Sequence, residues 1–84
     1  MASEAEALIK ASQIQAARSL LGWTQQQLAD KALVSLNAVA RLEQEKGDAR
    51  VSTVLRVKRA LEGAGIRFLF ATDSEGIGVR LKKP

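Results

Sequence analysis

The segment Trp23–Glu43, WTQQQLADKALVSLNAVARLE, most constrains the fold, because it carries two helix starts separated by a very short connection. Thr24 is followed three residues later by Gln27, which is the spacing of a capping box at a helix start. Ser35 is a residue type that caps a second helix, in which apolar residues recur at helical spacing. The connection, residues 32–34, is about as short as a helix-turn-helix allows. The sequence therefore predicts two helices at a tight turn, the second with its outer face free to enter a DNA major groove.

Helical periodicity also flanks this pair on both sides. On the N-terminal side, a helix is expected to begin either at the capping box of Ser3 and Glu6 or afresh near Ser12. In both cases Gly22 is well placed to end it. On the C-terminal side, apolar residues at i, i+3 and i+7 predict a helix over residues 52–62, which two glycines then close.

The apolar period changes to two after residue 65, so we divide the chain into a helical DNA-binding part, residues 1–65, and a β-hairpin, residues 66–84. Residues 72–76 form a suitable hairpin loop. Because an isolated two-stranded hairpin is marginally stable in water, its apolar face is expected to cover the helices and its edge to pair with a second copy. The residues expected to form this dimer are Ile66, Phe68, Phe70, Ile77, Val79 and Leu81. The alternative dimer surface is the last helix with the loop at Gly47.

Composition limits the chemistry that the chain can perform. Its 84 residues form one small core and include neither cysteine nor histidine, which removes the commonest general base and the commonest metal ligands. Since caps and turns account for the serines, we expect no catalytic residues, no metal site, no cofactor and no enzyme activity. Neither a signal-peptide pattern nor an apolar run of about 20 residues is present, so we expect a cytoplasmic protein without membrane contact.

The net charge of +4 comes from the second half of the chain. Residues 1–46 hold five basic and five acidic side chains, whereas residues 47–84 hold eight basic and four acidic ones. Such a surplus fits a polyanionic partner, although ordinary solubility also favours a net charge away from zero.

The segment from about Gln13 to Leu61 resembles the Cro/C1-type helix-turn-helix repressors, also called the Xre family. Several spaced positions carry the resemblance at once: Ala17-Arg18, Leu21-Gly22, Thr24-Gln25, Leu28-Ala29, Val34-Ser35, Val39, Leu42-Glu43 and the apolar stripe of the last helix. The resemblance implies a mainly α fold, a four- to five-helix bundle of the lambda-repressor-like type. Here the C-terminal β-hairpin follows that bundle.

The same resemblance assigns roles to individual residues. It implies a buried salt bridge between Arg18 and Glu43, and loss of one partner of such a pair costs about 3–5 kcal/mol. Gln25 matches a glutamine that binds a DNA phosphate at a helix start, where free N–H groups favour anions. Leu33 stands where the family usually has a glycine, so the turn is expected to carry strain of about 1 kcal/mol.

The chemistry of the second helix extends the candidate DNA contacts. Arg41 can donate twice to guanine and Asn37 can pair with adenine, while Leu36 and Ala38 can meet only thymine methyl groups. Basic residues in the following loop suit phosphate contacts. The predicted DNA-contact residues are Thr24, Gln25, Ser35, Leu36, Asn37, Ala38, Arg41, Lys46 and Arg50.

Together these features predict a homodimeric, sequence-specific regulator, in the first place a repressor, that binds double-stranded DNA. Its two recognition helices would lie about 34 Å apart and read an inverted repeat. The alternative is a protein-interaction module on the same fold, an antitoxin or an antiactivator with a protein partner. The apolar side chains of Leu36, Ala38 and Ala40 favour that alternative, because they suit a groove on another protein.

Overall fold

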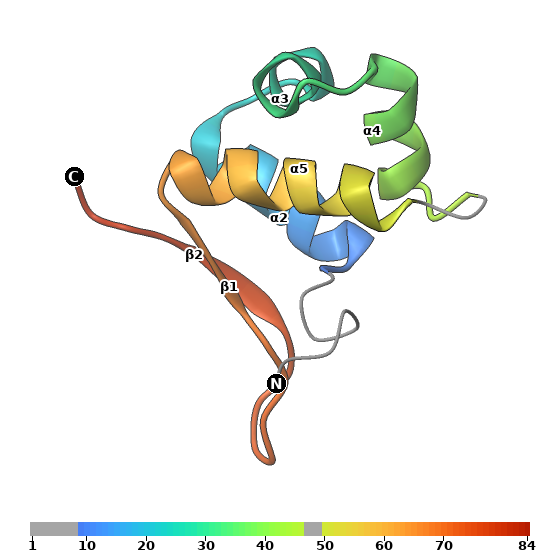
Figure 1. The fold of residues 1–84 in the computed structure, drawn as a ribbon. Helices are drawn as coiled ribbons and strands as arrows, with labels where there is room; N and C mark the ends of the chain where they lie inside the picture. The colour runs from blue at the N-terminus through green and yellow to red at the C-terminus, as the bar shows by residue number, and fades with distance from the viewer. Residues whose placement is uncertain (1–8, 47–49) are drawn as a thin grey trace.

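The computed structural model describes residues 9–46 and 50–84. Its elements are α2 (Ala11–Leu21), α3 (Gln25–Ala32), α4 (Leu36–Glu43), α5 (Val51–Gly63), β1 (Ile66–Leu69) and β2 (Gly78–Leu81). Figure 1 shows α3 and α4 above the crossing pair α2 and α5, with the hairpin running beneath them. This arrangement confirms the predicted mainly helical fold of the lambda-repressor-like type with a C-terminal hairpin.

The start of α2 lies close to the second of its two predicted positions. The helix begins at Ala11, and the side-chain Oε1 of Gln13 accepts a hydrogen bond of 2.8 Å from the backbone N–H of Lys10. The alternative start at Ser3 lies outside the described residues. Gly22 ends the helix as predicted, with a φ of +70° that a residue without Cβ adopts freely.

Local capping builds the helix-turn-helix as the sequence predicts. The Thr24 hydroxyl accepts from the backbone N–H of Gln27 at 3.1 Å, and the Gln27 side chain accepts from the Thr24 N–H at 2.8 Å. The hydroxyl of Ser35 accepts from the N–H of Ala38 at 3.0 Å and so caps α4. Between the helices, Leu33 has a φ of +58°, which is the left-handed conformation expected where relatives have glycine.

One aliphatic core joins all the elements. The predicted stripe of α5 is buried, and that helix extends one residue beyond its predicted range at each end. The largest fully buried side chains of the core are Ile14, Leu28, Val39, Val57, Leu61 and Ile66. No helix in the described part of the chain is long and apolar enough to cross a membrane.

The hairpin is antiparallel and pairs Ile66 with Leu81 and Phe68 with Val79. Its strands are shorter than the alternation predicts, since the ladder stops at Leu69 and Gly78. At that point the buried amide of Gln13, which is only 3% exposed, donates to both of their carbonyl oxygens at 3.0 Å.

Two residues of the predicted dimer surface have side chains that are buried within their own protomer. Ile66 and Phe68 are 2% and 7% exposed and pack in the core of their own protomer, because the helices cover that part of the hairpin. A partner therefore cannot reach them. Phe70, Ile77 and Leu81 are exposed, and Val79 is half-buried.

Candidate nucleic-acid interface

A salt bridge holds the C-terminal end of α4 against α2. Nε of Arg18 lies 2.6 Å from Oε2 of Glu43, and Nη2 donates to Oε1 at 2.8 Å. The Glu43 side chain is only 4% exposed. The hydrogen bond to Glu43 raises the pKa of Arg18 above its ordinary value, partly opposed by burial of the guanidinium. The structure thus places both residues in the salt bridge that the resemblance implies.

Two glutamines complete this network, and sequence reasoning missed both contacts. Gln15 of α2 donates to the backbone carbonyl of Glu43 at 2.9 Å, and Gln25 of α3 donates to its Oε1 at 3.1 Å. Gln15 lies three residues before Arg18 on α2, so the two side chains lie on the same face of the helix. This spacing is the sequence signal that could have predicted the contact of Gln15 with Glu43. The carboxylate of Glu43 therefore ties α4 to both preceding helices and fixes the angle at which α4 presents its outer face.

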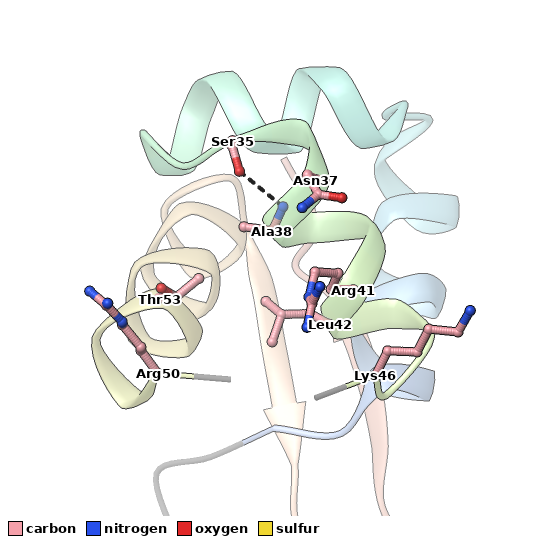
Figure 2. A pocket seen from close by; sticks show the side chains of 8 residues that line it. All are labelled: Ser35, Asn37, Ala38, Arg41, Leu42, Lys46, Arg50 and Thr53. Carbon is pink, nitrogen blue, oxygen red and sulfur yellow. Dashed lines mark hydrogen bonds between the residues drawn. The ribbon is translucent and has the colours of Figure 1, made fainter. Parts of the chain in front are cut away.

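That outer face borders an open groove between α4 and the start of α5, with a volume of about 220 Å³ (Figure 2). Asn37 and Arg41 project from α4, Lys46 follows the helix, and Arg50 stands at the start of α5. The groove is lined by Ser35, Asn37, Ala38, Arg41, Leu42, Lys46, Arg50 and Thr53. None of these described residues is acidic, so the groove presents three cations to solvent.

Six of the nine predicted DNA-contact residues line this groove, and three lie outside it. The hydroxyl of Thr24 caps α3, and Gln25 beside it contacts Glu43. Leu36 is 44% exposed at the start of α4. Sequence reasoning missed the groove residue Thr53, which comes from the first turn of α5, because no local pattern places that turn beside α4.

A contact from α5 supports the turn that precedes α4. Nη1 of Arg56 donates to the backbone carbonyl of Leu33 at 3.2 Å. The carbonyl belongs to the residue in the left-handed conformation, so the bond joins α5 to the most strained position of the turn.

Comparison with known proteins agrees with this geometry. The sequence model of the helix-turn-helix family matches residues 14–64, more than half of the chain, which includes all four described helices apart from the first residues of α2. A search of curated proteins found no match. The matched range, the capped helix pair and the cationic groove together show that the chain belongs to the Cro/C1-type (Xre) helix-turn-helix family of DNA-binding regulators.

Proposed function

We propose that the protein is a dimeric repressor that recognises an inverted repeat through α4. The observation that carries this proposal is the cationic groove along α4. Arg41, Lys46 and Arg50 line this groove, and within the described residues the only ion pair joins Arg18 and Glu43. Basic groups on the outer face of a helix and just after it suit contacts with the phosphates that border a major groove.

In this proposal α4 reads base edges. Arg41 donates to guanine and Asn37 pairs with adenine, each worth about 1–3 kcal/mol of discrimination against the wrong base. Ser35, Leu36 and Ala38, at the first turn of the helix, approach the bases most closely, and the two apolar side chains contact thymine methyl groups. The sparse polar content of this surface leaves part of the specificity to DNA shape.

The remaining predicted contacts hold the phosphates. Lys46 follows the end of α4, and Arg50 immediately precedes α5. Thr24 and Gln25 stand at the start of α3, where free backbone N–H groups favour an anion. Glu43 orients the amide of Gln25, because the hydrogen bond between them fixes one of its N–H groups. Such contacts set position and register and add affinity without selecting sequence.

In this proposal the protein represses transcription by occupying a promoter. Two copies with recognition helices about 34 Å apart read half-sites one helical turn apart, and the bound dimer blocks polymerase. The test is selection from a randomised duplex library across a salt series. We expect an inverted repeat, bound more weakly as salt rises. Recovery of no sequence, with binding at low salt only, would reject the proposal.

A second candidate, a protein-interaction module, is favoured by two exposed leucines, one in the turn before α4 and one at the start of α4. Leu33 is 79% exposed and Leu36 is 44% exposed. Replacement of Asn37 and Arg41 by alanine separates the candidates. A DNA reader loses specific duplex binding, whereas a protein-binding module such as an antitoxin retains its partner, as measured by co-purification.

A further inference from the structure

The side-chain contacts that tie α4 to other helices gather at its C-terminal end. Arg18 and Gln25 both bind the carboxylate of Glu43, the last residue of the helix. Val39, in the middle of the helix, packs in the core, whereas Leu36 at its first position is 44% exposed. The place of the first turn of α4 therefore depends on the short connection that precedes it.

That connection is strained, and a side chain from α5 holds it. Leu33 has a φ of +58°, a conformation that costs energy for a residue with a Cβ. Its backbone carbonyl accepts a hydrogen bond of 3.2 Å from Nη1 of Arg56, across 23 residues of chain. The bond therefore attaches the turn to a helix outside the helix-turn-helix pair.

Arg56 lies on the same face of α5 as two residues of the groove. Arg50 immediately precedes the helix, Thr53 lies in its first turn, and Arg56 follows three residues later, a spacing that places the three side chains on one face. Arg50 and Thr53 line the groove beside α4, whereas the guanidinium of Arg56 donates to the carbonyl of Leu33. One face of α5 thus borders the groove and also supports the turn before α4.

We propose that Arg56 is a positioning residue for sequence recognition. It holds the turn at Leu33, and the turn sets the place of the first residues of α4 in the major groove. This inference rests on the proposed function, because it requires that α4 reads base edges. In this proposal Arg56 does not contact DNA and acts only through the carbonyl of Leu33.

The two ends of α4 should respond differently when the turn is released. Because Glu43 holds the C-terminal end, a loosened turn lets the helix swing about that end. With a rise of about 1.5 Å per residue, Asn37 lies about 9 Å and Arg41 about 3 Å from Glu43 along the axis. The same swing displaces Asn37 about three times as far as Arg41. Loss of the Arg56 contact should therefore weaken base recognition by Asn37 more than by Arg41.

Selection from randomised duplexes with the Arg56→Ala protein tests this difference. Asn37→Ala and Arg41→Ala first show which base pair each residue reads. Arg59→Ala is the matched control, since it removes the same charge from another exposed position of α5. We expect Arg56→Ala to lower the preference at the Asn37 base pair about fivefold, the lower end for one bidentate base contact. The preference at the Arg41 base pair should fall less than about twofold, and Arg59→Ala should leave both preferences unchanged.

The salt dependence of binding separates positioning from a phosphate contact. Loss of a phosphate contact weakens binding to all sequences alike and reduces the slope of log affinity against log salt by about one. Arg56→Ala and Arg59→Ala should instead have the same slope. An equal loss of preference at both base pairs, or a slope for Arg56→Ala that is smaller by about one, would overturn the proposal.

Hydrogen exchange without DNA tests the hold on the turn independently of the repressor. The backbone N–H of Val34, directly after the strained residue, donates to a carbonyl of α3, and that of Gln44, at the far end of α4, donates to a carbonyl of α4. Arg56→Ala should speed exchange at Val34 relative to Gln44 about threefold or more, and Arg59→Ala should not. Faster exchange at Val34 without sequence selection by the wild-type protein would reject the repressor and keep the hold of Arg56 on the turn. Sequence selection with unchanged exchange would overturn the role of Arg56 and keep the repressor.

Discussion

The helix-turn-helix and the hairpin are each held by one buried polar side chain, Glu43 of α4 and Gln13 of α2, and these two side chains work differently. Glu43 binds side chains from α2 and α3, so directional contacts fix the angle of α4. Gln13 binds two backbone carbonyls at the end of the hairpin ladder, while apolar burial of Phe68 holds the hairpin in place. The comparison shows that the DNA-reading helix is oriented by charge and hydrogen bonds, whereas the hairpin is attached mainly by its hydrophobic face.

Truncation of the hairpin anchor should give the largest loss of stability. Phe68→Ala removes a buried ring from the common core and should cost about 3–5 kcal/mol of unfolding free energy in urea titrations. Phe70→Ala, in the same strand region but exposed, is the control and should cost less than about 1 kcal/mol. Similar losses in the two variants would show that the hairpin does not share the core.

Removal of the charge that orients α4 should give the second-largest loss of stability. Glu43→Ala leaves the guanidinium of Arg18 without its partner and should cost about 3 kcal/mol, the lower end for broken buried pairs because Arg18 is partly exposed. Urea unfolding measures the loss, with Glu45→Ala, an exposed carboxylate two residues on, as the control. A loss below about 1 kcal/mol would mean that packing alone orients α4.

Removal of the amide that joins α2 to the hairpin should have a local effect. Gln13→Ala leaves the carbonyls of Leu69 and Gly78 without that donor and should cost about 1–2 kcal/mol. Hydrogen exchange should speed up at hairpin amides more than in α4. Gln26→Ala, which removes an exposed amide bonded to Asp30, is the control. Uniformly faster exchange would contradict the separation of the two regions.

A substitution in the turn between α3 and α4 should give the smallest change in stability, and it should stabilise the protein. Leu33→Gly should stabilise the fold by about 1 kcal/mol, because glycine adopts a φ of +58° without strain from a Cβ. Leu33→Ala keeps the Cβ and should change stability little. Thermal unfolding of both variants separates backbone strain from loss of the exposed side chain, and equal stabilities would rule out strain as the cause.

The sequence predicted those parts of the fold that depend on residues close together in the chain. The capping of α3 by Thr24 and the capping of α4 by Ser35 follow from spacings of a few residues, whereas the left-handed Leu33 was expected from the glycine that the family usually has there. Similarity to a family, rather than spacing, gave the pair of Arg18 and Glu43.

Contacts between distant residues were not predictable in the same way. Gln13 meets carbonyls 56 and 65 residues away, and Arg56 meets Leu33 across 23 residues. Period-two alternation continues through residues 70 and 77, yet the ladder ends before them, because pairing depends on tertiary contacts such as the one with Gln13. Alternation also could not separate the buried Phe68 from side chains that face solvent.

The reach of Gln13 has a consequence for the order of events during synthesis. Its amide contacts Leu69 and Gly78, so a ribosome must add more than fifty further residues before those partners exist. Until then the side chain stays in water or meets other groups. The capped helices can form in the meantime, since their contacts are local. The contacts of Gln13 with the hairpin therefore form only after the residues of the DNA-reading helices have been made.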